Sequence, residues 1–318
     1  MTRILLVKTS SMGDIIHNLP LVHDLTRHFP QAEIDWVCEE NFAEIPTLHP
    51  AIRKVIPVAI RRWRKHLLCR TTWQEIGRFR QAVQQTDYDF VLDTQGLVKS
   101  ALITRMAHGQ KFGYSAACAR EPLASRFYNQ TFTVDPQSHA ADRYRALAAQ
   151  AFSYTPDSLI DYGLQPPAIE LPWQTNTRYV VLLTATSRDE KLWPLADWVA
   201  LGRHLNALGY ACILPWGNAA EEQRCRDLAS QLDNALVTPR LSLTEAARLL
   251  AQAQLVVGVD TGLVHLATAM HTPTVAIYVA SSPGRNGLYA SSPAFNLGAE
   301  GHPPAAAEVI HTAESLLR

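Results

Sequence analysis

The chain contains no apolar run of the roughly 18 residues that a membrane-spanning helix needs. Its apolar start, residues 4–7, is also too short for a signal peptide and is followed at once by Lys8. The five cysteines include no C-x-x-C pair, which argues against structural zinc and a disulfide framework. Neither sign of charge is in excess, because 29 basic residues balance 29 acidic ones. We therefore expect a cytoplasmic protein with reduced thiols and no general affinity for nucleic acid.

The turn after the first apolar run lacks the G-x-G-x-x-G fingerprint of a dinucleotide site. Residues 4–7 nevertheless predict a buried strand that leads through a Gly-containing turn into a helix. This turn carries Asp14 close to the expected start of the helix. The pattern alone leaves two roles open for Asp14, a helix N-cap or a functional carboxylate at the carboxyl end of a strand.

Strand and helix patterns alternate along the whole chain, which favours an α/β fold with parallel sheets. A length of 318 residues suggests two domains. Strands are expected near residues 3–8, 33–38, 55–59, 88–93, 179–183, 210–214, 255–259 and 274–279. Helices are expected near residues 14–28, 73–86, 96–107, 139–152, 194–208, 219–232, 242–253, 263–270 and 304–318.

A proline-rich segment, residues 154–173, separates the two series of patterns and indicates a linker. We place the domain boundary near residues 165–175 and divide the chain into residues 1–168, 169–303 and a final helical segment, 304–318. The prediction is two Rossmann-like domains with a cleft between them, which is a favoured place for a ligand.

Polar residues follow the expected first strand of the second domain. Thr186, Ser187 and Lys191 offer hydroxyls and a cation just before a helix that is expected to begin at Pro194. These groups suit a diphosphate, although an ordinary exposed loop would have the same composition.

Two further strand ends of this domain carry similar groups. Asp260, Thr261, Gly262 and His265 follow a buried strand and enter a helix, where backbone N–H groups favour an anion. Glu222 follows another strand, in a place where nucleotide folds often bind ribose hydroxyls. Each residue also has a plainer role available, as a helix cap, a half-buried imidazole or an acid at a helix N-terminus.

Residues 53–80 contain nine basic residues and only one acidic residue, Glu75. Apolar side chains are mixed in, among them Trp63, Leu67, Leu68 and Trp73. This mixture fits a polyanionic surface such as nucleic acid, lipid headgroups or an acidic sugar, or else a solvated face.

The chain resembles the bacterial lipopolysaccharide heptosyltransferases in several short motifs that occur in order along nearly its whole length. The motifs are residues 7–14 (VKTSSMGD), 55–65 (VIPVAIRRWRK), 95–100 (QGLVKS), 119–125 (AREPLAS), 214–217 (LPWG) and 259–265 (VDTGLVH). The resemblance implies the GT-B architecture, with the final helix packed back on the first domain. It also implies inverting transfer of L-glycero-D-manno-heptose from ADP-heptose to the inner Kdo of Kdo2-lipid A.

Roles for matching residues also come from this resemblance. Asp14 would be the general base. The donor pocket would contain Thr186, Ser187, Lys191, Glu222, Asp260, Thr261, Gly262 and His265. The acceptor side would contain Arg61, Arg62, Arg64, Lys65 and Arg120. Ser187 replaces a common Thr, and residues 279–285 depart from the usual loop, so no contact is assigned to that loop.

We expect no cofactor and no essential metal, because the sequence offers no D-x-D pair of the sort that would chelate one. The expected partners are ADP-heptose, Kdo2-lipid A and the anionic inner-membrane surface on its cytoplasmic face. Three alternatives remain, namely a related heptosyltransferase with another acceptor, a nicotinamide-dependent oxidoreductase and a nucleic-acid binder.

Overall fold

The computed structural model describes residues 2–173, 178–186, 188–289 and 292–318. The chain forms two compact units that divide between Leu164 and Gln165. The division lies at the start of residues 165–175, the range in which the proline-rich segment predicts the boundary.

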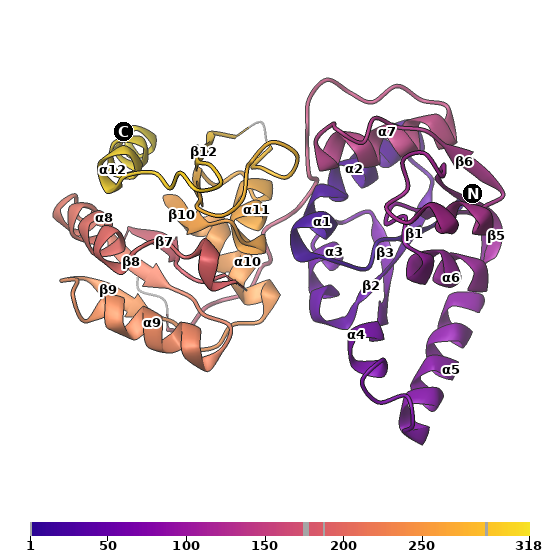
Figure 1. Ribbon diagram of the computed structural model, residues 1–318, viewed down its shortest axis with the longest axis horizontal. Coiled ribbons are helices and arrows are strands. Elements are labelled where there is room, and N and C mark those ends of the chain that lie inside the picture. Colours follow the sequence, from indigo (N-terminus) through magenta and orange to yellow (C-terminus); the bar gives the residue numbers. More distant parts are fainter. Residues whose placement is uncertain (1, 174–177, 187, 290–291) are drawn as a thin grey trace. The chain divides into compact units, whose positions relative to one another are not determined.

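Unit 1 is a doubly wound α/β domain. Its six strands are all parallel and lie in the order β3-β2-β1-β4-β5-β6. Figure 1 shows α2 and α7 on one face of this sheet and α5 and α6 on the other. The strands are β1 (Arg3–Val7), β2 (Glu33–Glu39), β3 (Ile52–Val58), β4 (Asp87–Asp93), β5 (His108–Tyr114) and β6 (Gln130–Phe132). The α-helices are α1 (Met12–His17), α2 (Leu19–His28), α3 (Glu44–Thr47), α4 (Ile60–Trp63), α5 (Arg70–Gln84), α6 (Val98–Met106) and α7 (Ala140–Phe152).

Unit 2 repeats this plan. Its six parallel strands lie in the order β12-β11-β10-β7-β8-β9. When β7 is numbered as the first strand and the sheet is read from its other edge, this is the same strand order as in unit 1. The strands are β7 (Tyr179–Leu183), β8 (Ala211–Leu214), β9 (Ala235–Val237), β10 (Leu255–Val259), β11 (Thr274–Tyr278) and β12 (Ala294–Gly298). The α-helices are α8 (Leu195–Ala207), α9 (Ala219–Ala229), α10 (Leu243–Gln252), α11 (Gly262–Ala269) and α12 (Ala306–Leu317).

Both orders reverse direction once, and the reversal fixes where a ligand can bind. In unit 1 the chain leaves β1 toward β2 on one side, and β4 pairs with β1 on the other. In unit 2, β7 and β10 have the same relationship. A crevice opens at such a switch point, beyond the carboxyl ends of the two strands. The segments that follow β1, β4, β7 and β10 are therefore the expected ligand-binding segments.

The last helix packs within its own unit. In the structure α12 belongs to unit 2, where it contacts α8, β10 and β11. Val309 and Ala313 are fully buried in a core that also contains Trp198, and Trp193 Nε1 donates to the carbonyl of Pro304 at 3.0 Å. The physical reason is that the apolar stripe of α12 completes the core beside α8.

Local differences from the expected elements also have simple causes. The helix expected over residues 14–28 is two helices, because Pro20 lacks a backbone N–H and the first helix ends at His17, with Asn18 as its C-cap. Pro194 is the N-cap of α8 rather than its first residue. Ser242 and Glu245 form a capping box at the start of α10, with the Glu245 N–H donating to Ser242 Oγ at 3.1 Å.

Candidate functional site

Asp14 lies at the switch point of unit 1 and is held on both carboxylate oxygens. Its Oδ1 accepts a hydrogen bond of 2.7 Å from the Tyr144 hydroxyl. Its Oδ2 accepts from the backbone N–H and from the hydroxyl of Ser11, each at 3.0 Å. Ser11 is the N-cap of α1, so the possible role of Asp14 as the N-cap is wrong. Asp14 instead occupies the third helical position and bonds back to the cap.

Lys8 places a buried cation beside this carboxylate. The side chain of Lys8 is almost fully buried, and its Nζ lies 3.7 Å from Asp14 Oδ1. Burial lowers the pKa of Lys8 to about 8, although Asp14 opposes that shift. Burial also raises the pKa of Asp14, but Lys8, Tyr144 and Ser11 outweigh it, and the pKa ends well below its usual range. Asp14 is therefore a carboxylate at any pH near neutrality.

The turn that carries Asp14 is shaped by the segment after β4. Gln95 Oε1 accepts from the backbone N–H groups of Thr9 and Ser10, at 3.0 and 3.2 Å. Asp93 is buried and accepts from the N–H groups of Gln95 and Gly96 at 2.8 and 3.1 Å. The motif 95–100 thus has a structural task, which is to fix the loop that follows β1.

In unit 2, Asp260 gathers several of the expected donor-pocket side chains at the corresponding switch point. Lys191 Nζ forms a salt bridge with Asp260 Oδ2, and Ser281 Oγ donates to the same oxygen at 2.7 Å. His265 Nε2 lies 4.0 Å from Asp260 Oδ1. Burial acts to raise the pKa of Asp260, but hydrogen bonds from Lys191 and Ser281 lower it overall. The site is an ionised carboxylate with a cation already bound to it.

The start of α11 adds backbone donors to this cluster. Thr261 is the N-cap, and its side chain makes no capping hydrogen bond, so its hydroxyl is not occupied by the helix end. Gly262 is the first helical residue, where N–H groups have no partner within the helix. Thr186 Oγ1 donates to the Asp260 carbonyl at 3.4 Å, which brings the segments after β7 and β10 together. Ser187 lies outside the described residues.

Glu222 lies on α9 and pairs with Arg226, with Nη2 to Oε1 at 2.5 Å. Its neighbour Glu221 closes the turn by accepting from the Gly217 N–H at 2.7 Å. Between these loops is a hollow of about 200 Å³ whose lining includes Thr186, Asn218 and Glu221. The hollow lies where the segments after β7 and β8 meet.

The basic stretch is less positive than its local sequence suggests. Arg62 binds Glu40 with two hydrogen bonds of 3.0 Å and Glu75 with one of 2.8 Å. Arg53 pairs with Asp35 at 2.6 Å. Acids from other segments therefore neutralise part of the stretch, and Arg62 is the expected acceptor residue whose guanidinium is already occupied.

Other basic residues gather around Lys99. Burial lowers the pKa of Lys99, and although Glu39 opposes this, Arg61, Arg64 and Arg120 lower it further. Each of these arginines therefore lies within electrostatic reach of Lys99. The exposed side chains of Arg61, Arg64 and Arg120 thus form, with Lys99, an anion-attracting cluster. Lys65 is exposed on the same loop as Arg64.

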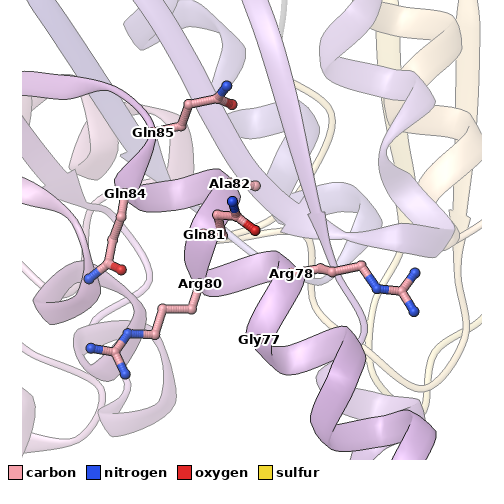
Figure 2. A pocket seen from close by; sticks show the side chains of 7 residues that line it. All are labelled: Gly77, Arg78, Arg80, Gln81, Ala82, Gln84 and Gln85. Carbon is pink, nitrogen blue, oxygen red and sulfur yellow. The ribbon is translucent and has the colours of Figure 1, made fainter.

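Two other arginines of the stretch lie along α5. Arg78 and Arg80 line an open hollow of about 510 Å³ along α5. Figure 2 shows their side chains extending in different directions from the helix. Arg78 and Arg80 therefore do not form one continuous basic surface on α5.

The tip between α4 and α5 exposes apolar side chains. Leu68 is fully exposed, and Leu67 and Trp73 are 52% and 60% exposed. Trp63, by contrast, is buried and donates from Nε1 to Glu75 at 2.7 Å. Figure 1 shows this tip projecting beyond the sheet of unit 1. No helix in the described part of the chain is long and apolar enough to cross a membrane.

Sequence reasoning missed Lys8, Tyr144, Lys99 and Ser281. Lys8 and Lys99 stand inside quoted motifs, so their position beside a strand end could have singled them out.

Sequence reasoning also missed one D-x-D sequence, Asp87 to Asp89, although this lies at the start of β4. Asp89 there accepts from the Arg3 N–H at 2.8 Å, at the end of the sheet opposite to Asp14. Among the described residues, no group of three acids, histidines or cysteines is arranged to hold a metal ion.

Comparison with known proteins gives consistent results. The sequence model of glycosyltransferase family 9 (heptosyltransferase) matches residues 76–310. The chain is 47% identical over 292 residues to lipopolysaccharide heptosyltransferase 1 of Pseudomonas aeruginosa, covering 91% of this chain and 82% of that one. Among solved structures, E. coli heptosyltransferase WaaC with ADP matches with a TM-score of 0.92 and 40% identity, covering 99% of this chain and 100% of that one. The same enzyme with ADP-2-deoxy-2-fluoro heptose matches with a TM-score of 0.90 and 40% identity, over 99% of each chain.

Proposed function

The chain belongs to glycosyltransferase family 9 (heptosyltransferase), and from that premise we propose that it transfers L-glycero-D-manno-heptose from ADP-heptose to the inner Kdo of Kdo2-lipid A. The donor is supported by the likeness to a structure that holds an ADP-heptose analogue. The observation that carries the reaction is an ionised carboxylate, Asp14, fixed at the switch point of unit 1. This carboxylate is the group that an inverting transfer requires.

In this proposal Asp14 acts as the general base. The acceptor hydroxyl attacks the anomeric carbon of the donor, the bond from that carbon to the diphosphate oxygen breaks, and Asp14 takes the hydroxyl proton. A single displacement inverts the anomeric configuration, as in inverting sugar hydrolysis with a hydroxyl in place of water. Positioned general-base catalysis contributes about 10²–10⁴-fold. We therefore expect Asp14→Asn to lower kcat by that factor while ADP affinity is retained.

The leaving diphosphate gains negative charge, and the residues of unit 2 would stabilise it. Lys191 supplies the cation, Thr186, Ser187 and Thr261 supply hydroxyls, and the first turn of α11 supplies N–H groups. Asp260 aims Lys191 through their salt bridge, and with His265 it orients heptose hydroxyls. Gly262 allows close approach to the backbone, and Glu222 binds the ribose.

The acceptor is an acidic glycolipid, and the cation cluster of unit 1 would bind its carboxylates and phosphates. Arg61, Arg64 and Arg120 act around Lys99, with Lys65 beside them. Arg62 is held by Glu40 and Glu75, so in this proposal it exchanges one of these carboxylates for a carboxylate or phosphate of the acceptor.

We also propose that the enzyme contacts the anionic surface of the inner membrane on its cytoplasmic face. The exposed Leu67, Leu68 and Trp73 support this, because basic residues flank them at a projecting tip. Each apolar side chain contributes at most roughly 1.5–3 kcal/mol when it leaves water. The double substitution Leu67→Ser/Leu68→Ser should lower binding to phosphatidylglycerol vesicles at least about tenfold. Leu159→Ser, at a leucine that is 73% exposed elsewhere in unit 1, is the matched control and should change nothing.

The deciding experiment incubates the protein with ADP-heptose and Kdo2-lipid A and detects the added heptose by mass spectrometry. A parallel reaction offers the already heptosylated glycolipid. Product from the first acceptor alone supports the proposal, whereas product from the second alone identifies an enzyme that acts later in core assembly. The absence of transfer to either acceptor would refute it.

A further inference from the structure

We propose that Lys8 and Tyr144 are positioning residues for the reaction, which together hold the Asp14 carboxylate ionised and fixed toward the acceptor hydroxyl. This inference rests on the proposed function of Asp14 as the base. It concerns two residues that touch neither the donor nor the acceptor in that proposal and act only through Asp14.

The hydrogen bonds form a chain with one direction. Lys8 Nζ donates to the Tyr144 hydroxyl oxygen at 2.7 Å and to the Thr94 carbonyl at 3.3 Å. The Tyr144 hydroxyl donates to Asp14 Oδ1, also at 2.7 Å. A hydroxyl carries one proton, and because an ammonium group can only donate, Lys8 directs the proton of Tyr144 toward Asp14. Lys8 therefore orients the hydrogen bond from Tyr144 that holds the Asp14 carboxylate, and it also keeps that carboxylate ionised.

Burial makes this arrangement effective. Lys8 is 2% exposed and Tyr144 is 3% exposed, so water does not screen the pair. Asp14 keeps 24% of its side chain exposed, and a reacting hydroxyl can therefore reach it. Tyr144 comes from α7 and Lys8 from the end of β1, so the position of the base is set by two elements that are both anchored in the core.

Other charged groups surround the chain of hydrogen bonds. Asp93 raises the pKa of Lys8, whereas Arg143 and Arg120 lower it. One turn along α1, the rings of His17 and His139 pack edge to face with centroids 4.9 Å apart.

The effect on Asp14 has a definite sign. Burial is the largest influence on the pKa of Asp14 and acts to raise it, while Lys8 is the strongest opposing influence. If the ammonium is removed, the strongest influence that opposes burial is lost, and hydrogen bonds from Tyr144 and Ser11 remain. The pKa of Asp14 then rises, and the base becomes protonated at a pH at which the wild-type base is still ionised.

The test measures kcat and both KM values from pH 9 down to the lowest pH at which each protein stays folded, for the wild type, Lys8→Met, Tyr144→Phe and the double variant. The acidic fall in kcat should begin at a higher pH in Lys8→Met than in the wild type, by about one to three pH units, which is the effect of one opposite charge at this distance. Tyr144→Phe should shift the profile in the same direction by less, and KM for ADP-heptose should stay within about twofold. The double variant should lose no more than about threefold beyond Lys8→Met, because both residues act on one carboxylate.

Tyr154→Phe is the matched control. Tyr154 belongs to the same unit, and its buried hydroxyl has no hydrogen-bond partner among the described residues. Its variant should keep the wild-type pH profile. Melting curves check that each variant folds. If Lys8→Met does not fold, the pH profile of Tyr144→Phe, which keeps the aromatic ring, tests the inference.

Two results would overturn the inference. One is an acidic side of the profile that is unchanged in Tyr144→Phe and Lys8→Met. The other is a uniform loss at every pH accompanied by a changed donor KM, which indicates structural damage. Failure of the proposed function looks different, because the wild type itself would then transfer no heptose.

Discussion

Replacing Lys191 with alanine should weaken ADP binding, because the change removes a cation and also leaves the charge of Asp260 uncompensated. Lys191 neutralises Asp260 through a salt bridge in the switch-point crevice of unit 2. Without the lysine, Ser281 and His265 still face Asp260, so the carboxylate stays ionised at neutral pH. An arriving diphosphate then meets an uncompensated negative charge and also lacks its cation.

The expected loss of ADP affinity depends on how deeply Lys191 and Asp260 are buried. The two side chains are only 17% and 19% exposed, so solvent screens them less than a surface pair. A hydrogen bond to a charged group contributes about 1.5–3 kcal/mol. A loss of about 2 kcal/mol raises the Kd for ADP roughly 30-fold. Adding Asp260→Asn to Lys191→Ala removes the repelling charge and should restore about half of that free energy, an improvement of roughly fivefold.

Isothermal titration calorimetry with ADP measures both effects. Lys65→Ala is the matched control, since it removes an exposed lysine from unit 1 and should leave the ADP affinity unchanged. The reasoning would be refuted by an unchanged affinity in Lys191→Ala. It would equally be refuted if the double variant bound ADP more weakly than Lys191→Ala.

Four further predictions address stability, metal dependence and acceptor binding. Arg145→Met should destabilise unit 1 by about 3–5 kcal/mol in urea unfolding, because it leaves the buried Asp24 unpaired; a loss below 1 kcal/mol would contradict this. Gly96→Ala should cost about 1–2 kcal/mol, since φ is +67° there and a Cβ atom would lie 3.0 Å from Tyr114, and an unchanged urea midpoint would argue against strain. Heptose transfer should persist in EDTA, and its complete loss, reversed by Mg²⁺, would show a metal requirement. KM for the acceptor should rise several-fold between 50 and 300 mM NaCl while the donor KM changes less, and an equal rise in both would speak against separate anion sites.

The interior strands and the strand-end residues were readable from the sequence because burial on both faces leaves continuous apolar runs. The expected strand at residues 179–183 coincides with β7. The strands that were not expected are β5, β6, β9 and β12. Three of these lie at sheet edges, where one side is open and an apolar run is not required. The fourth, β5, contains glycine and polar residues.

The candidate site was predictable only where its residues are close in sequence. Asp260 and His265 share one motif, and the family resemblance draws attention to both. Tyr144 stands 136 residues from Lys8 and looks like an ordinary core aromatic on α7. Contacts of this kind depend on the folded arrangement, and no local pattern indicates them. Local sequence also overstated the charge of the basic stretch, because Glu40 and Asp35 come from outside it.

The shared strand order of the two units has a consequence for how such an enzyme can change. Each unit has its own crevice, built from loops whose lengths and side chains can vary while the strands beneath them stay the same. The residues expected to recognise the glycolipid all belong to unit 1, and those expected to grip the nucleotide sugar all belong to unit 2. Mutation can therefore redirect the enzyme to a new recipient sugar and leave its source of activated heptose untouched.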